Sequence, residues 1–332
     1  MVGNAPESVK KNIVNKRRDR LHVHDFLHIS EAKRNELVQW EYPKTPQERF
    51  CIAHANTYTT RLLKQAGMPV YDIPEKNIHI LPGDLYKNIC GADSGGCTMC
   101  SEQAILLNAV NVRKSGLLFG STNFHEMLHL KGAMTIYVRN DEEKKDFYGR
   151  PFRQGLSVFG TEKSEEDFGK YEYFKGLHEA IVTFAEKAYI EELMQTSEMS
   201  EERRYWESST IIEKRKKIAQ ERGVSMDDIK WVGEDGSFQS SGYPVQRKVL
   251  EFILGEILSA YPDDFSSTES VYGKFLNAHL TGHLSSIAKL VDGAIGTGAF
   301  RVLGIMGKDK ESSVLVGRTL VMMRRERKRR GI

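Results

Sequence analysis

The segment HEMLH at residues 125–129 constrains the fold of this 332-residue chain more than any other feature. Two histidines four positions apart lie on one side of an α-helix, one turn apart, so both imidazoles can bind a single metal ion. Glu126 projects beside them, where it can face a water molecule at the metal. Good N-cap residues at 121–123 precede the motif, and Gly132 follows it. We therefore expect a helix over residues 124–131.

A catalytic zinc site needs a third protein ligand and keeps its fourth position open. His125 and His129 supply two ligands, and Glu179 is the best candidate for the third. It lies on the next strongly amphipathic segment, 173–194. Two other interpretations stay open: a helix with two surface histidines, and a partly exposed helical acid. His178 is also a possible ligand, although it points to a different face of the same helix.

At this point the chain resembles the gluzincin metallopeptidases, especially their compact, minigluzincin-like members. In that family a helix carries HExxH, and a following helix supplies a glutamate from an Asn-Glu-Ala-type motif. The resemblance implies that His125, His129 and Glu179 bind zinc (Zn2+) and that Glu126 is the general base. It covers about residues 75–305 in the order of the elements and rests on two short motifs.

The chain departs from the gluzincin pattern at two positions. His178 stands where asparagine is usual, and Thr183 stands where an acidic residue, one turn after the ligand, commonly orients a zinc-bound histidine. The missing acid motivates an alternative function, that of a catalytically weak or latent zinc-binding regulatory protein.

Together with the resemblance, these residues predict hydrolysis of peptide bonds. Zinc lowers the pKa of a bound water toward about 7 and polarises the scissile carbonyl, while Glu126 takes a proton and returns it to the leaving amine. Tyr243, in SGYPVQRKVLEF, is our candidate donor to the developing oxyanion, because gluzincin relatives often place a tyrosine or histidine there. Arg247, one turn further on, could brace it. The alternative for Tyr243 is a turn tyrosine packed on the core.

Other potential metal ligands have simpler interpretations. His279 and His283 (HLTGH) lie four apart in a predicted helix, and without an intervening glutamate we expect core or cleft-wall histidines. The CTMC segment at 97–100, with Cys90 nearby, is a single CxxC, whereas a strong zinc signal needs a second pair. Cys51 could complete four thiolates only through the fold. Loop thiols, a structural metal site and a redox pair stay open.

Both ends of the chain are basic. Residues 1–46 contain HxHxxxH (His22, His24 and His28), and we expect a solvated arm or a cover over the cleft. The C-terminal cluster RRERKRR could touch nucleic acid, which defines a second alternative, a nucleic-acid-associated protein. These clusters lack interleaved aromatic residues, and such runs are usually solvated.

The composition favours a soluble, cytoplasmic protein whose partner is a peptide or protein substrate. Forty-eight basic and 45 acidic residues give a net charge of only +3, which argues against an extended nucleic-acid-binding or membrane-binding face. The first thirty residues contain no apolar secretory signal, and no uninterrupted apolar stretch is long enough to span a bilayer. Four cysteines fit a reducing compartment. The composition predicts no particular oligomeric state.

We expect an α+β, zincin-like fold with a small mixed sheet and the cleft between two lobes. After the basic arm at 1–46, the metallopeptidase domain spans 47–332: an α/β lobe with the active-site helix at 47–132, a hairpin insertion at 133–172, a mainly helical lobe at 173–323 and a basic tail at 324–332.

The hydrophobic periodicity predicts the individual elements. In the first lobe we expect a helix over 45–67, an extended segment over 69–81, a helix over 102–112 and a short strand at 116–120. The insertion should contain strands at 133–139 and 156–159. In the second lobe we expect helices over 173–194, 244–260, 271–291 and 299–306, with a solvated helical insertion at 195–240.

Overall fold

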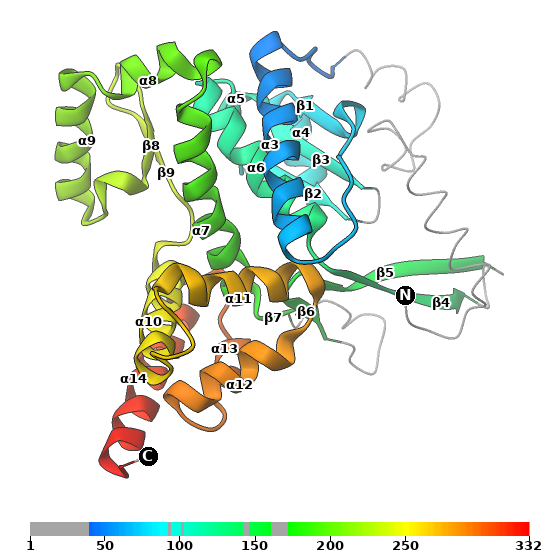
Figure 1. The fold of residues 1–332 in the computed structure, drawn as a ribbon. Helices are drawn as coiled ribbons and strands as arrows, with labels where there is room; N and C mark the ends of the chain where they lie inside the picture. The colour runs from blue at the N-terminus through cyan, green and yellow to red at the C-terminus, as the bar shows by residue number, and fades with distance from the viewer. Residues whose placement is uncertain (1–39, 92–93, 101–102, 142–145, 161–171, 332) are drawn as a thin grey trace.

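The computed structural model describes residues 40–91, 94–100, 103–141, 146–160 and 172–331 (Figure 1). Helices predominate and the strands form three small sheets, so the α+β class is as expected. Most of the basic N-terminal arm, with His22, His24 and His28, lies outside the described residues. In the part of the chain that is described, no helix combines the length and the apolar character needed to cross a membrane.

The N-terminal lobe packs a three-stranded sheet against helices. In chain order its elements are α3 (Pro46–Gln65), η2 (Glu75–Asn77), β1 (Ile78–Leu81), α4 (Gly83–Cys90), β2 (Gly96–Met99), β3 (Ala104–Asn108), α5 (Ala109–Val112) and α6 (Gly116–Lys131). The strand order is β1-β3-β2, with β3 parallel to β1 and antiparallel to β2. Helices α3 and α6 pack against each other (Figure 1).

Two expectations for this lobe are wrong. Residues 116–120 form the first turns of α6 and not a strand, because Ser115 caps the helix in place of 121–123: Ser115 Oγ accepts a hydrogen bond from Leu118 N at 3.1 Å. Residues 102–112 are not one helix and contain β3 and the short α5. Residues 104–109 and 117–120 are buried, and an apolar run buried on all sides has no period that separates helix from strand.

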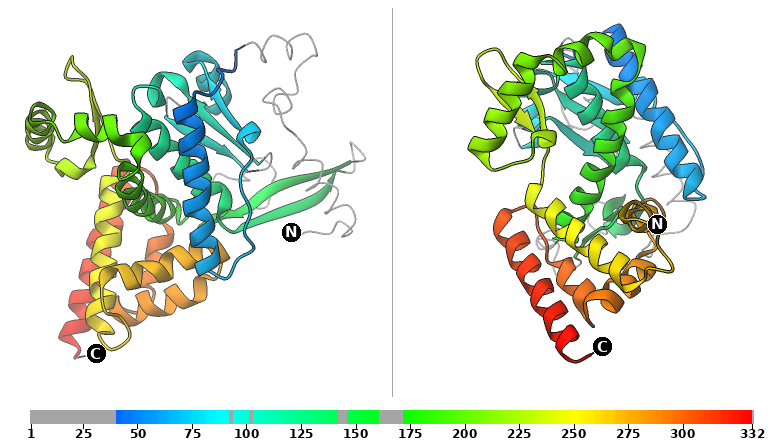
Figure 2. Two further views of the ribbon diagram at one scale, coloured as in Figure 1. Left: turned by 45° about the horizontal axis from the view of Figure 1, so that its top comes forward. Right: turned by 60° about the vertical axis from the view of Figure 1, so that its left-hand side comes forward.

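Four strands form the expected insertion that follows α6: β4 (Met134–Asp141), β5 (Asp146–Gln154), β6 (Ser157–Phe159) and β7 (Glu172–Tyr173). The antiparallel pair of β4 and β5 projects from the body of the molecule (Figure 1, Figure 2). The sequence analysis missed β5, and the strand that it expected at 156–159 is β6. Gly149 and Pro151 inside β5 are poor strand formers, which explains the miss.

The C-terminal lobe is mainly helical. Its elements are α7 (Lys175–Met194), η4 (Ser197–Met199), α8 (Ser200–Trp206), α9 (Ser209–Arg222), η5 (Met226–Asp228), β8 (Ile229–Val232), β9 (Phe238–Ser240), α10 (Pro244–Ala260), α11 (Thr268–Thr281), α12 (Leu284–Ile295), α13 (Ala299–Gly304) and α14 (Lys310–Arg329). Helix α10 packs against α7, α12 and α14 (Figure 2). The helices expected at 173–194 and 244–260 are confirmed as α7 and α10.

Three details of this lobe differ from expectation. The segment 195–240 ends in an antiparallel hairpin, β8 with β9, rather than being only helical. The helix expected over 271–291 is two helices, α11 and α12, because Gly282, with φ of +80°, ends α11 in a left-handed cap. The basic residues at 324–329 are not a separate tail and form the last turns of α14, with Arg330 as its C-cap.

A single hydrophobic core joins the two lobes. Phe124 of α6 stacks on Tyr189 of α7 with ring centroids 4.2 Å apart, and Tyr58 of α3 packs edge-on against both rings. The same core continues to Phe275 of α11 and Leu320 of α14. Buried aromatic packing therefore fixes α6 and α7, the two helices that carry the predicted metal ligands.

Candidate metal centre

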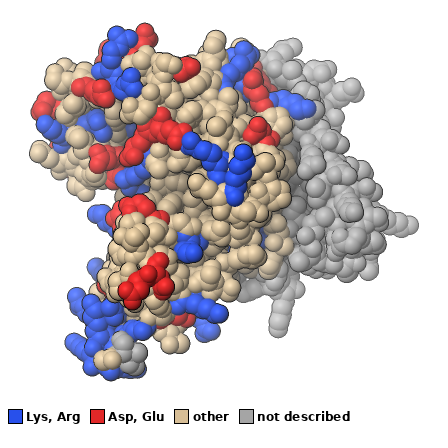
Figure 3. Space-filling model, in the orientation of Figure 1, with Lys and Arg blue, Asp and Glu red and all other residues tan. Residues whose placement is uncertain are grey.

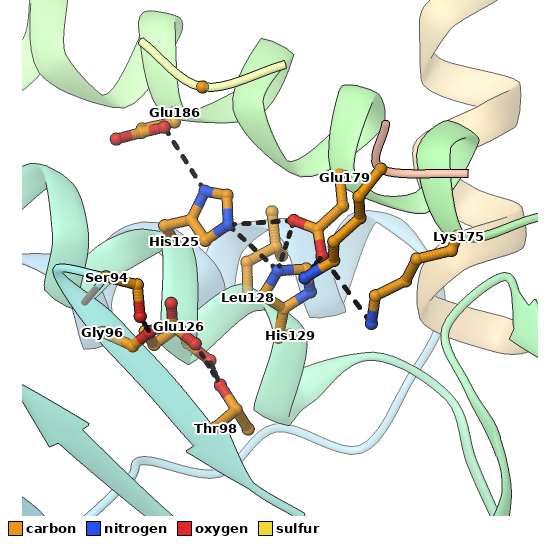
Figure 4. A network of polar contacts seen from close by, with 12 residues as sticks. Ser94, Gly96, Thr98, His125, Glu126, Leu128, His129, Lys175, Glu179 and Glu186 are labelled. Atoms are coloured by element: carbon orange, nitrogen blue, oxygen red, sulfur yellow. Dashed lines mark hydrogen bonds and ion pairs between the residues drawn. The ribbon is translucent and has the colours of Figure 1, made fainter. Parts of the chain in front are cut away.

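Helices α6 and α7 bring the three predicted ligands together. His125 Nε2 and His129 Nε2 lie 3.0 Å apart, and Glu179 Oε2 lies 3.4 Å from the first nitrogen and 3.3 Å from the second (Figure 4). Among the described residues, no other group of three or more histidine, cysteine or acidic side chains converges closely enough to hold a metal ion.

The donor set fits zinc. Two imidazole nitrogens and one carboxylate oxygen are ligands of catalytic zinc sites, which keep a further position open for water or substrate. Glu179 Oε2 is buried, and within the described part of the chain it makes no hydrogen bond of good geometry. The oxygen and the two ring nitrogens therefore face one point that an ion could occupy.

Burial and charge set the protonation of these residues when no metal is bound. Burial opposes the charged form of His125, but the neighbouring carboxylates of Glu179 and Glu186 outweigh it and raise its pKa to about 10. Burial lowers the pKa of His129 to about 3, against the attraction of Glu179. Burial would raise the pKa of Glu179, but His129 and His125 hold it well below the usual range. Metal binding must therefore displace a proton from His125.

Glu186, two turns beyond Glu179 on α7, contacts His125 from the side away from the metal point (Figure 4). Its Oε2 lies 3.4 Å from His125 Nδ1, and its Oε1 accepts hydrogen bonds from Ser121 Oγ and Lys230 Nζ. Burial would raise the pKa of Glu186, but Lys230 and His125 lower it to about 2. The ionised carboxylate fixes the orientation of the ring whose Nε2 faces the metal point.

The sequence analysis looked for this acid at the wrong position. Thr183, one turn after Glu179, is buried, and its hydroxyl makes no hydrogen bond with a described residue. Glu186 lies seven residues after Glu179, which returns to the same face of the helix after two turns. An acidic residue seven positions after Glu179 was therefore the sequence signal that could have identified the partner of His125.

Glu126 lies beside the ligands, on the side of β2 (Figure 4). Thr98 Oγ1 donates to Glu126 Oε2 at 2.6 Å, and Gly96 lets the strand come so near that a Cβ there would lie 2.6 Å from Glu126 Cγ. Burial raises the pKa of Glu126, and His125 and Thr98 offset part of that increase. A raised pKa suits a group that takes and returns a proton near neutral pH. Neither Thr98 nor Gly96 was predicted.

Tyr243 lines the same pocket as Glu126 and Glu179. It precedes α10 in a left-handed backbone conformation with φ of +57°. Burial and the carboxylates of Glu179 and Glu126 raise the pKa of Tyr243, so its hydroxyl stays protonated and able to donate. The nitrogen of Lys308 lies 5.7 Å from the centroid of its ring.

Arg247 braces the loop before α10 and not the Tyr243 hydroxyl itself. Its Nε donates to the Gly242 carbonyl at 3.2 Å, and its Nη1 lies 2.7 Å from Asp228 Oδ1. Lys187 of α7 lies 2.9 Å from the same aspartate oxygen. Arg247 therefore supports Tyr243 only indirectly, through the backbone carbonyl of the preceding Gly242.

Two lysines that the sequence analysis missed face the second oxygen of Glu179. Lys308 Nζ lies 2.8 Å from Glu179 Oε1, and Lys175 Nζ lies 3.7 Å from the same atom and 2.9 Å from Glu172 Oε1. These cations stabilise the ionised form of the ligand carboxylate and leave its Oε2 directed at the histidines.

Three further histidines do not belong to the ligand set. His178 stacks on His129 with centroids 4.5 Å apart, and burial lowers its pKa well below the usual range. His279 is a core histidine, as expected, with Nε2 3.1 Å from the Leu128 carbonyl oxygen. His283 is exposed and precedes α12, so the two histidines of HLTGH are not on one helix, and the expectation of a core or cleft-wall histidine is wrong for His283.

The cysteines form no metal site in the described part of the chain. Cys90, at the end of α4, and Cys97, in β2, are in hydrogen-bond contact and line the pocket. Cys51 lies in the main core, with Sγ 3.8 Å from the Gly116 carbonyl oxygen, and so does not complete a set of four thiolates. Cys100 is buried.

The basic C-terminal cluster takes part in packing. Arg324 pairs with Glu256 of α10, and Arg327 Nη1 donates to the Asp292 carbonyl at 3.1 Å. Lysine and arginine side chains gather at this end of the molecule, whereas both signs are mixed over the rest of the face in view (Figure 3). Among the described residues of that face, the basic side chains do not extend into a larger surface.

The metal point lies in a pocket of about 710 Å³ between β2, α6, α7, the segment before α10 and the loop before α14. That volume is in the range of sites that bind small ligands or a few residues of a peptide. No family model, curated protein or solved structure matches this chain significantly.

Proposed function

We propose that this protein is a zinc-dependent metallopeptidase. The observation that carries the proposal is the convergence of His125, His129 and Glu179 on one point, with Glu126 beside them in an open pocket. Two imidazoles, one ligand carboxylate and one carboxylate that is not a ligand are the residues that zinc-assisted hydrolysis requires. Zn2+ is the metal that this set favours.

The position of β2 supports a peptide as the substrate. It is the last strand in the order β1-β3-β2, and residues 95–98 line the pocket beside Glu126. An edge strand offers backbone N–H and C=O groups that can pair with an extended chain. A peptide added along β2 would place one of its bonds next to Glu126 and the metal ligands.

Each residue then has a defined task. A bound zinc ion would activate a water molecule and polarise the scissile carbonyl. Thr98 donates a hydrogen bond to Oε2 of Glu126. The other oxygen, Oε1, would accept a proton from the water and return it to the leaving amine. Tyr243, which lines the same pocket, would donate its hydroxyl to the carbonyl oxygen as negative charge develops. Glu186 keeps the His125 ring in the orientation that exposes Nε2.

Of the two alternatives, neither gains a specific observation. The latent or catalytically weak zinc protein was motivated by the missing acid at Thr183. Glu186 supplies an acid beside His125 from another position, so this reason for the alternative no longer applies. The nucleic-acid-associated protein rested on basic ends, and Arg324 and Arg327 of the C-terminal cluster contact α10 and α12.

Peptide cleavage by the zinc-loaded protein tests the proposal. A diverse peptide library should acquire new termini, read by mass spectrometry, and Glu126→Gln should lower turnover by at least about a hundredfold while zinc stays bound. Cleavage that is unchanged in Glu126→Gln would refute the assigned mechanism. No cleavage by the wild type, with one zinc bound per chain, would favour the latent alternative.

A further inference from the structure

The charge of the pocket is positive once zinc is counted. Three carboxylates line it, those of Glu126, Glu179 and Glu186, and three ammonium groups line it as well. Glu172, which pairs with Lys175, adds a fourth carboxylate beside the pocket, so a bound zinc ion would leave these groups with a small net positive charge. Ions of opposite sign attract strongly in such a recessed site, which therefore favours an anionic substrate group.

Of the three pocket lysines, Lys308 is the one that remains accessible. The Lys308 side chain is 50% exposed, against 18% for Lys175 and 13% for Lys230. Lys230 is held by Glu186, and Lys175 is paired with Glu172. Glu179 Oε1 accepts from Lys308, but an ammonium group carries three N–H donors and so can bind a second carboxylate.

The loop that carries Lys308 is rigidly held. The buried side-chain amide of Gln246 lies within hydrogen-bonding distance of three successive carbonyl oxygens, those of residues 307–309, at 3.2, 2.8 and 3.2 Å. Gly176 N donates to the Met306 carbonyl at 2.7 Å, and Asp309 caps α14 by accepting from Ser312 N at 2.6 Å. The ammonium group therefore extends from a preorganised support, which is what a recognition group requires.

We propose that Lys308 recognises a carboxylate of the peptide substrate close to the scissile bond, and that the protein selects anionic peptides. Lys308 Nζ lies only 2.8 Å from an oxygen of the metal ligand Glu179. An extended chain advances about 3.3–3.6 Å per residue, so the carboxylate belongs within about two residues of the bond that is cut. It is either the C-terminal carboxylate or an aspartate or glutamate side chain. This inference rests on the proposed peptidase function.

The test compares charged and neutral forms of one peptide that the wild type cleaves near its C-terminus. Four versions are needed: a free C-terminus, a C-terminal amide, and amides with glutamate or glutamine as the last residue. We expect kcat/KM to be about tenfold or more higher for the carboxylate forms, the strength of one charge-assisted hydrogen bond. The free acid and the glutamate amide separate the two sources of the carboxylate.

Variants at Lys308 show whether this residue is responsible. Lys308→Met should reduce the charged-to-neutral ratio of kcat/KM to within about twofold, and Lys308→Arg should keep part of it. Lys310→Met is the matched control, since Lys310 is exposed nearby and does not line the pocket, and it should keep the full ratio. The ratio is the readout because Lys308 also contacts Glu179.

The outcomes separate this inference from the function on which it rests. Equal cleavage of all four peptides by the wild type, or a ratio that persists in Lys308→Met, would overturn the role of Lys308 and leave the peptidase in place. Failure of the wild type to cleave any peptide would overturn both.

Discussion

At the scale of single residues, the candidate site depends on contacts behind the ligands. His125 has a carboxylate on each side: Glu179 faces Nε2 and Glu186 faces Nδ1. An imidazole that donates from Nδ1 to a carboxylate presents Nε2 as the metal ligand and is more basic toward the metal. Lys230 and Ser121 in turn contact Glu186. Lys230 belongs to β8, so the hairpin β8–β9 is linked to His125 through the Glu186 carboxylate.

Replacement of that supporting carboxylate should weaken zinc binding. For Glu186→Gln we expect zinc affinity to fall by about 10- to 100-fold, because the neutral amide cannot stabilise the His125 ring as a carboxylate does. Competition with a chromophoric chelator measures the affinity. Glu191→Gln, at an exposed position on the same helix, is the control and should bind zinc normally. An unchanged affinity in Glu186→Gln would show that the contact has no such role.

At the scale of elements, the packing of α3 against α6 encloses a charged group. Lys131, in the last turn of α6, donates to Asn56 Oδ1 at 3.1 Å and to Thr59 Oγ1 at 2.8 Å, both on α3. Burial lowers the pKa of Lys131 from 10.5 to about 8. The folded protein therefore releases this proton at a lower pH than the unfolded chain does.

This difference gives the contact between α3 and α6 a defined pH dependence. Between about pH 8 and 10.5 the unfolded chain binds more protons at Lys131, so its contribution to the free energy of unfolding rises with pH. We expect the wild type to gain about 2–3 kcal/mol relative to Lys131→Met across this range. Urea denaturation of both proteins at several pH values checks this. A stability difference that is constant with pH would contradict the buried, shifted amine.

At the scale of the whole molecule, the metal point joins the two lobes. His125 and His129 come from the N-terminal lobe and Glu179 comes from the first helix of the C-terminal lobe, and one core runs through both. An ion bound to all three would link the lobes and would bind the folded chain only, since the unfolded chain does not bring the ligands together.

Removal of zinc should therefore lower the thermal stability of the protein. At a free zinc concentration about a thousandfold above Kd, binding adds about 4 kcal/mol, which for a chain of this length corresponds to a shift in Tm of roughly 5–10 °C. Calorimetry with and without a chelator measures the shift. His129→Ala should show little zinc-dependent change, and an equal shift in that variant would place the metal elsewhere.

The sequence by itself determined what short-range geometry controls. The HEMLH spacing puts His125 and His129 on one side of any helix that contains them, and amphipathic periodicity identified the helix that carries Glu179. A helix start with a local signal, that of α10 at Pro244, was also readable. These features depend on the backbone within a few residues, so they need no tertiary contact.

Only the tertiary structure decided what depends on packing between distant segments. The buried runs at 104–109 and 117–120 took their helix or strand state from their neighbours, because burial on all sides erases periodicity. The supporting contacts of Glu186, Thr98 and Lys308 join elements far apart in the sequence, and no local spacing encodes such a contact. The candidate ligands could thus be identified from the sequence, while the groups that would orient them and charge the pocket required the fold.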